Sequence, residues 1–324
     1  MTPELLRALV AAACTSPSVH NVQPARWRID GADLVLHEDR SRRLSVGDPS
    51  GKDTRISLGA AAEGLVLAAG RDGLAATATI LHESGGTMPA IARLTFAPGA
   101  EADPLAAHLE GRASWRGAFT PPGPADREAA AAVAGANTAV ATDPVSLAWL
   151  AGLCDEASYG FMRQDGFRAE LLGWMRLSRR HPGWTRDGLN AEAMRMSGLE
   201  AIGAGLVLGP LFRPLAALGL APHLLAERKS FADAAGVALF YRPADEDPFE
   251  SGRHFHRCWL ELEAAGFGAN VLAALADDTA IAARIAKHFG IGPERRLVSA
   301  FRFGRRNGAG FPRARLPLSE VLLD

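Results

Sequence analysis

Three segments of the sequence are rich in side chains that bind phosphate groups and flat polar rings. The loop SPSVHNVQP at residues 16–24 offers serine hydroxyls, an asparagine amide and turn N–H groups. In RASWR, residues 112–116, the two arginines can converge on one dianion, because arginine forms charge-assisted and often bidentate bonds to phosphate. In PRARLP, residues 312–317, alternate residues of an extended chain face the same side, so both arginines can reach one phosphate.

Each segment has an ordinary alternative when it is considered alone. The first also fits a polar loop, the second a solvated basic stretch and the third a surface tail. Their chemistry therefore depends on elements that would bring them together.

The first third of the chain predicts a helix, a hairpin, a helix and two more strands. Apolar residues from Leu5 to Ala13 repeat at helical spacing and stop before the first loop. Residues 26–29 and 34–36 alternate around an Asp30-Gly31 turn, which is typical of a β-hairpin. A helix rich in small residues is expected at 56–69, followed by strands at 75–81 and 91–96.

The remaining two thirds predict a second unit. Residues 98–125 are rich in Pro, Gly and charge, so we place a boundary near residue 105 and expect one half at 1–105 and the other at 106–324. Helices are expected at 147–156, 167–178 and 255–265, and strands at 237–241 and 297–303. An apolar insertion around 195–228 is expected to form a buried or lid-like helix pair. In both halves a helix closes on a glycine, at Gly73 and at Gly266, which suggests an old duplication.

Composition narrows the classes of protein and of partner. The chain has 324 residues, 48% of them hydrophobic and 22% charged, as in globular proteins. Its 35 basic and 36 acidic side chains give a net charge of −1, so nucleic acid and membrane surfaces are not expected as partners. Three scattered cysteines and no export signal predict a cytoplasmic protein without a disulfide framework.

Together, the three segments resemble the FMN-dependent nitroreductase family. That family combines an Arg-x-Ser-x-Arg segment, a Ser-Pro-Ser-x-x-Asn-x-Gln-Pro loop and a basic C-terminal pair, contributed by two subunits of an obligate dimer. This sequence is similar to the fused two-half, mycobacterial Acg-type NAD(P)H nitroreductases, since the loop lies in its first half and the arginines in its second. The resemblance implies a nitroreductase-like α+β fold, with two mixed antiparallel sheets covered by helices, a fused pseudo-dimer in one chain. One complete set of parts implies one FMN site.

The resemblance also implies roles for individual residues. Its cofactor-binding residues would be Ser18 and Asn21 at the flavin, Arg112, Ser114 and Arg116 at the phosphate or ribityl chain, and Arg313 and Arg315 at the phosphate. A backbone N–H near Ala273, Ala274 and Leu275 would face flavin N5. Ala113, Val19 and Ala25 depart from the family pattern, so some polar contacts would be missing or replaced.

Residues 175–190 hold charged and aromatic side chains that fit either a solvated helix end or a pocket wall. In the second case Trp184 would stack on a substrate and Arg186 would bind the phosphate of a nicotinamide donor. His20 is a further candidate for contacting flavin or substrate.

Other signals for cofactors are weaker. His254, His256 and Cys258 alternate, but a helix does not place alternate residues on one face, so no metal is expected. No complete dinucleotide fingerprint follows a strand.

We therefore expect a ping-pong enzyme in which FMN takes hydride from NAD(P)H and passes it to a small oxidant such as a nitroaromatic or a quinone. No side chain need act as an acid or base. The alternative is a protein that stores or scavenges FMN without turnover, with the insertion closed over the flavin. The chain is expected to act as a monomer that is an internal pseudo-dimer.

Overall fold

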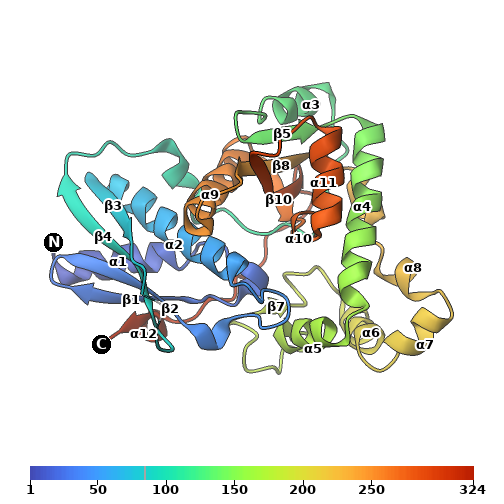
Figure 1. Cartoon of the computed structure of the whole chain (residues 1–324), viewed down its shortest axis with the longest axis horizontal. Coiled ribbons are helices and arrows are strands. Elements are labelled where there is room, and N and C mark those ends of the chain that lie inside the picture. The colour runs from blue at the N-terminus through green and yellow to red at the C-terminus, as the bar shows by residue number, and fades with distance from the viewer. Residues whose placement is uncertain (84) are drawn as a thin grey trace.

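The computed structural model describes residues 1–83 and 85–324, which form two large sheets and one two-stranded sheet, with helices between and around the large ones (Figure 1). The first sheet has strand order β11-β1-β2-β4-β3 and is antiparallel except for the β1–β11 pair. Its strands are β1 (Ala25–Asp30), β2 (Asp33–Glu38), β3 (Leu74–Ile80), β4 (Ala90–Pro98) and β11 (Leu322–Leu323).

Local sequence explains the elements of this sheet. The predicted hairpin is confirmed: β1 and β2 pair from Ala25 opposite Glu38 to Asp30 opposite Asp33, and Gly31 adopts the positive φ of +63° that the tight turn needs. Helix α1 (Pro3–Ala13) is capped by the Thr2 side chain and has proline in its first turn.

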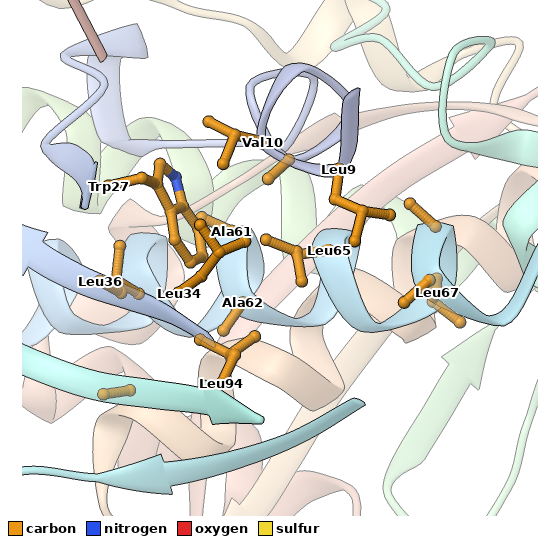
Figure 2. Packing of buried hydrophobic residues seen from close by; sticks show 14 of the residues in the cluster. Leu9, Val10, Trp27, Leu34, Leu36, Ala61, Ala62, Leu65, Leu67 and Leu94 are labelled. Atoms are coloured by element: carbon orange, nitrogen blue, oxygen red, sulfur yellow. The ribbon is translucent and has the colours of Figure 1, made fainter. Parts of the chain in front are cut away.

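Helix α2 (Lys52–Arg71) is the centre of the first unit. Its first turn is fixed by Asp48, whose carboxylate accepts from the amides of Asp53 and Thr54 at 3.1 and 2.8 Å. Fifteen of its residues are buried, because small and apolar residues surround the helix on nearly all sides. Figure 2 shows Leu9 and Val10 of α1 and Trp27 of β1 close to its inner face.

The second sheet is wholly antiparallel, in the order β5-β8-β10-β9. Its strands are β5 (Thr138–Ala141), β8 (Gly236–Pro243), β9 (Gly268–Val271) and β10 (Arg295–Gly304), and helix α9 (Pro248–Ala264) connects β8 to β9. In both sheets the first four strands therefore lie in the order first, second, fourth, third, with a long helix after the second. The two units share one topology, and their origin by fusion stays a prediction.

Helices α2 and α9 cross at the centre of the molecule, where their backbones come very close (Figure 1). A Cβ added to Gly59 would lie 1.9 Å from the carbonyl oxygen of Phe249, and one added to Gly252 would lie 2.1 Å from that of Ile56. Each helix also contributes to the other unit's core, with Phe249 in the first and Ile56 in the second. The two units are joined by a glycine-lined helix crossing.

The other helices mostly cover the second sheet. They are α3 (Pro124–Ala131), α4 (Pro144–Met162), α5 (Asp165–Trp174), α10 (Ala274–Asp277) and α11 (Thr279–His288), with α12 (Leu318–Val321) beside β1. Several expected boundaries were wrong, and α4, expected to end at residue 156, continues to Met162. Helix α5 ends at Trp174 rather than 178, because β6 (Met175–Arg176) pairs with β7 (Leu189–Asn190). Helix α9 begins at Pro248 rather than 255, where Asp247 caps it.

The apolar insertion forms three short helices rather than a pair: α6 (Gly198–Leu208), α7 (Phe212–Ala217) and α8 (Ala221–Leu225). They lie at the edge of the molecule far from the first sheet (Figure 1). Several of their large apolar side chains are exposed, including Leu199, Ile202 and Leu218. None of the helices formed by residues 1–83 and 85–324 is both long and apolar enough to cross a membrane.

The end of the chain returns to the first sheet. Strand β11 pairs with β1 in parallel, with Trp27 opposite Leu322 and Arg28 opposite Leu323. The last residues of the predicted second half therefore belong to the first sheet. The half boundary near residue 105 stays a prediction.

Candidate functional site

The first predicted segment is a strained loop held against helix α2. His20, Asn21 and Gln23 have φ values of 43°, 55° and 54°, a left-handed conformation that residues other than glycine seldom adopt. The hydroxyl of Ser57 on α2 accepts from the amide of Val19 at 3.1 Å. The hydroxyl of Ser18 accepts from the amide of Gln23 at 3.0 Å. Helix α2 and Ser18 therefore fix the shape of the loop.

Asn21 joins this loop to the C-terminal segment. Its Oδ1 accepts from Nη1 of Arg315 at 2.8 Å, and its Nδ2 donates to the carbonyl oxygens of Gly188 and Ala314, each at 3.2 Å. This amide therefore positions Arg315. A direct contact between Asn21 and a flavin stays a prediction.

Gln23 was not among the expected site residues, but it makes an equivalent link. Its Oε1 accepts from the amide of Leu316 at 2.9 Å and its Nε2 donates to the carbonyl oxygen of Arg186 at 2.8 Å. The Asn-x-Gln-Pro pattern could have indicated this role, because the glutamine amide offers the same hydrogen-bond donors and acceptor as the asparagine amide.

The predicted arginines Arg112, Arg313 and Arg315 lie together, and we call them the arginine triad. Nη2 of Arg112 and Nη2 of Arg315 both donate to the carbonyl oxygen of Thr15, at 2.7 and 3.1 Å. Nη1 of Arg313 donates to the carbonyl oxygen of Arg112 at 2.8 Å. These three side chains therefore lie together beside the first loop, and their contact with a phosphate stays a prediction.

No carboxylate in the described part of the chain forms an ion pair with the triad. Glu263, the acid whose field reaches Arg112, is bound to Arg306 instead. The Nε atoms of Arg112 and Arg315 are buried without a hydrogen-bond partner. Buried positive charge without a counter-charge is costly, so the triad has the electrostatics of an anion site.

The pKa values of Arg112 and Arg315 reflect the close approach of these positive charges. Burial, with Arg315 and Arg313 nearby, holds the pKa of Arg112 well below its usual range. Burial and the adjacent Arg313 lower the pKa of Arg315 to about 10, while Cys14 acts in the opposite direction. A bound dianion would oppose both effects.

Ser114 and Arg116 continue from the triad along the edge of β9. The amide of Trp115 donates to the carbonyl oxygen of Ala269 at 2.8 Å, and the Ser114 hydroxyl donates to Oδ1 of Asn270 at 3.1 Å. The Arg116 guanidinium has no hydrogen bond or ion pair within residues 1–83 and 85–324.

The expected backbone donor near flavin N5 is narrowed from three residues to two. The amide of Leu275 already donates to the carbonyl oxygen of Leu272 at 3.2 Å, and its side chain is fully buried in the core of the second unit. Leu275 is therefore not a free donor. The amides of Ala273 and Ala274, at the start of α10, have no acceptor among the described residues.

The three candidate substrate residues have different surroundings. Burial and the nearby Arg116 lower the pKa of His20 to about 4, so its ring is neutral at pH 7, and its buried Nδ1 has no partner in the described chain. Arg186 forms an exposed ion pair with Glu320, 2.7 Å to Oε1, so its guanidinium is already occupied. Trp184 is half-buried and stacks on no described aromatic ring.

A buried histidine that the sequence analysis considered only as a metal ligand lies next to the triad. His256 donates from Nδ1 to the carbonyl oxygen of Ala60 at 2.8 Å. Its buried Nε2 has no hydrogen-bond partner in the described chain, and the buried hydroxyl of Ser16 has none either. Burial and the neighbouring Arg112 lower the pKa of His256 to about 3. A Cβ at Gly64 would lie 2.3 Å from Ser16 Oγ and 3.2 Å from His256 Cε1, so glycine permits their approach.

Both ends of the insertion lie beside these residues. Arg195 stacks on Trp115, with its Cζ 4.2 Å from the ring centre, and also lies over Phe311. At the other end, Glu227 acts electrostatically on Arg116. The residues at the two ends of the insertion therefore lie near Trp115 and Arg116.

Within the described ranges, no three His, Cys, Asp or Glu side chains are grouped to hold a metal ion. His256 and Cys258 lie on α9 with separate partners, Ala60 and Thr138. Cys14, Cys154 and Cys258 are all free thiols.

Comparison with known sequences gives a partial match. No family model matches the chain. A segment of 60 residues is 35% identical to the Mycobacterium tuberculosis protein named "Putative NAD(P)H nitroreductase acg", covering 18% of each chain. A second nitroreductase-named protein of that organism is 35% identical over 65 residues, 20% of this chain and 19% of its own. The predicted relationship to the nitroreductase family is confirmed over that part, which is under a fifth of the relatives' length.

Solved structures show weaker similarity. A nitroreductase-like protein from Anabaena variabilis covers 95% of this chain and 90% of its own, with 12% identity and a TM-score of 0.45. The FMN-dependent nitroreductase NfnB from Mycobacterium smegmatis, solved with NADPH, covers 67% and 96%, with 19% identity and a TM-score of 0.36.

Proposed function

Because the chain shares a homologous segment with nitroreductase-family proteins, we propose that it is an FMN-dependent oxidoreductase. In this proposal it passes hydride from NAD(P)H to a small oxidant, such as a nitroaromatic or a quinone, in ping-pong order. The fold is then a nitroreductase-like fused pseudo-dimer with one FMN site at the junction of its halves.

The observation that carries this proposal is the arginine triad beside the Ser18–Asn21 loop. Three clustered guanidinium groups that form no ion pair with a described residue, with Arg112 buried and Arg313 and Arg315 partly buried, fit a phosphate dianion, and the unpartnered Nε atoms of Arg112 and Arg315 are further donors. The loop comes from the first unit and the arginines come from later in the chain, as the resemblance to the family predicts for a site between two halves.

In this function the protein binds and orients, while FMN supplies the hydride chemistry. The triad would bind the phosphate, Ser18 and Asn21 would contact the flavin, and the amides of Ala273 and Ala274 would be available as donors to the ring. Neutral His20 beside Arg116 adds a polar group without adding charge. No titrating side chain is required to move a proton in this scheme.

Storage or scavenging of FMN without turnover is the second candidate. The observation that favours it is the attachment of the insertion at both ends of the site, through Arg195 on Trp115 and through Glu227 near Arg116. A lid that stays closed would keep nicotinamide and oxidant from the flavin.

Anaerobic addition of NADPH to the FMN-loaded protein separates the two functions. We expect the yellow absorbance to bleach and to return when a quinone is added. Persistent colour with a full complement of FMN would support storage, and a protein that takes up no FMN would contradict both functions. A variant such as Arg195→Ala, which releases the lid from Trp115, tests whether closure is what prevents bleaching.

A further inference from the structure

Exposed apolar side chains are concentrated on the three helices of the insertion. Of the eleven large apolar side chains that are exposed in the described chain, seven lie between residues 199 and 224. We call these seven the apolar patch: Leu199, Ile202, Leu206, Leu211, Leu218, Leu220 and Leu224. Single exposed apolar residues are ordinary in globular proteins, whereas a concentration of them indicates an interaction surface.

The patch is the outer side of helices whose inner side is already packed. On α6, Leu199, Ile202 and Leu206 follow one another at spacings of three and four residues and so share a face, while Leu208 is buried on the opposite side. Phe212 is buried in the same way on α7. The three helices pack against one another at one edge of the molecule (Figure 1). The insertion therefore folds on other residues and leaves the patch uncovered.

Two cavities lie where the insertion meets helix α4. One, of about 560 Å³, is lined by Tyr159 of α4 and by Phe212 and Arg213 of α7. The other, of about 650 Å³, is lined by Tyr159 and by Pro222 and His223 of α8. Because both contain Tyr159, the cavities are neighbours. The helices that carry the patch therefore also form two recesses in the protein surface.

The carboxylates that line these cavities are all neutralised. The pairs are Asp165 with Arg168 and Arg213, Asp155 with Arg228, and Glu156 with Arg284. The side chains of Arg163, in the first cavity, and Lys229, in the second, are exposed and have no hydrogen bond or ion pair within residues 1–83 and 85–324. The lining of the two cavities therefore has an excess of positive charge.

Glu227 does not change this balance. It lines neither cavity, and its charge acts on Arg116 and Arg302, which lie away from the patch. An apolar surface with free cations beside it requires a partner that offers both hydrocarbon and negative charge.

A second copy of this chain meets that requirement poorly. A two-fold interface places the same surface on both sides, so the free cations would find no negative charge there. A protein of another kind is also a weaker match, because the patch is entirely leucine and isoleucine, whereas Trp, Tyr and Arg dominate the binding energy of protein interfaces. The boundary of an anionic bilayer offers hydrocarbon for the aliphatic side chains and phosphate oxygens for the cations.

We propose that the apolar patch, with Arg163 and Lys229 beside it, is a docking surface for a lipid bilayer that contains anionic lipids. The aliphatic side chains enter the boundary between headgroups and acyl chains, and the two cations bind lipid phosphate. The net charge of −1 gives no general attraction to a membrane, so this binding is local and needs both parts. It does not depend on whether the chain binds FMN.

Flotation of the full chain with lipid vesicles tests the proposal. We expect the chain to float with vesicles of equal parts phosphatidylcholine and phosphatidylglycerol, and to bind phosphatidylcholine alone about tenfold more weakly or less, because two basic side chains lose their anionic partners. Lys229→Gln should lower the affinity for the anionic vesicles only. Lys287→Gln is its control, since Lys287 is an exposed lysine on α11, outside the patch.

The apolar part is tested by the double variant Leu199→Ser, Leu218→Ser. It should weaken binding to anionic vesicles by about tenfold or more, because both side chains lose contact with hydrocarbon. Val145→Ser is the matched control, since Val145 is 80% exposed but lies at the start of α4 outside the patch. All these side chains are exposed, so the variants should keep the Tm of the wild type.

A wild-type chain that floats with neither kind of vesicle would overturn the proposal, as would equal binding by the wild type and the double variant. Equal binding to neutral and anionic vesicles would overturn the role of anionic lipid. Sedimentation of the protein alone covers the remaining alternative: a dimer that the double variant converts to a monomer, without vesicle binding, would assign the patch to self-association. FMN binding should be the same in all variants, so failure here leaves the proposed function standing.

Discussion

Two arginine clusters in this protein have opposite electrostatic designs. In the paired cluster, made of Arg242, Glu246, Ser251 and Arg296, the acid is saturated: Glu246 Oε2 accepts from Arg242 Nε at 2.9 Å and from Ser251 Oγ at 2.7 Å. Nη2 of Arg296 donates to Ser251 Oγ at 2.7 Å. The arginine triad has three guanidinium groups and no carboxylate partner among the described residues.

This difference in charge balance indicates that the paired cluster stabilises the fold and that the triad binds a ligand. Burial alone would raise the pKa of Glu246, yet bonds from Arg242 and Ser251 hold it below its usual value, so the cluster stabilises its own charges. The triad does not stabilise its own charges, since burial and the neighbouring arginines lower the pKa values of Arg112 and Arg315. A cluster that neutralises itself supports the fold, while one that does not is built for an anion.

The largest effect is expected from breaking the paired cluster. Glu246→Gln removes the charge that Arg242 and Arg296 surround, so the free energy of unfolding should fall by about 3 kcal/mol. Denaturant unfolding measures this. The affinity for FMN should stay the same, and a large loss of FMN binding without a loss of stability would contradict the division between the clusters.

A smaller effect, of a different kind, is expected in the triad. Arg315→Ala should weaken FMN binding by about 1.5–3 kcal/mol if a charged hydrogen bond is lost. Fluorescence titration of FMN into the apo-protein gives the affinity, and Arg296→Ala is the control outside the triad. Unchanged affinity would remove both Arg313 and Arg315 from the site.

A third cluster of charged side chains extends the comparison, because it contains more carboxylates than basic groups. Lys52 Nζ lies 2.8 Å from Asp277 and 3.5 Å from Asp53, and Asp48 is close by. Burial, then Asp277, raise the pKa of Asp53 to about 7, against an unfolded value of about 3.9. The folded state thus holds the extra proton, and the resulting stability is lost as the pH rises from about 4 through about 7.

Asp53→Asn should therefore flatten the pH dependence of stability and raise the Tm at pH 8 by a few degrees. Thermal unfolding of both proteins between pH 5 and pH 8 checks this, with Asp72→Asn, at the far end of α2, as the control. A lower Tm for Asp53→Asn at pH 8 would mean that the Lys52–Asp53 contact outweighs the repulsion.

Local chemistry explains which parts of the fold the sequence could predict. The β1–β2 hairpin follows from Asp30-Gly31 between alternating residues, and α2 follows from its run of small and apolar residues. Strand β11 could not be predicted, since two residues carry no periodicity and their pairing depends on where β1 lies. The insertion is helical as expected, but its exposed leucines follow from how it packs.

The candidate site also has residues that the sequence could predict and residues that it could not. The triad was predictable because arginines spaced by two or four residues have a known preference for phosphate. The burial of Arg302, a residue of β10 that is only 2% exposed, was not predictable, because one arginine between Phe301 and Phe303 resembles the outward residue of an ordinary strand. Only the packing of Phe119 and Phe231 over it shows that it is inside.

The segment that carries Arg313 and Arg315 is fastened at both ends, by β10 before it and by β11 on the first sheet after it. Its middle is held by Gln23, through the amide of Leu316, and by Thr185, which accepts from the amide of Arg315 at 3.0 Å. A chain ordered in this way loses little conformational freedom when a ligand arrives. Removing Leu322 and Leu323 would therefore weaken anion binding without deleting a single contact to the anion.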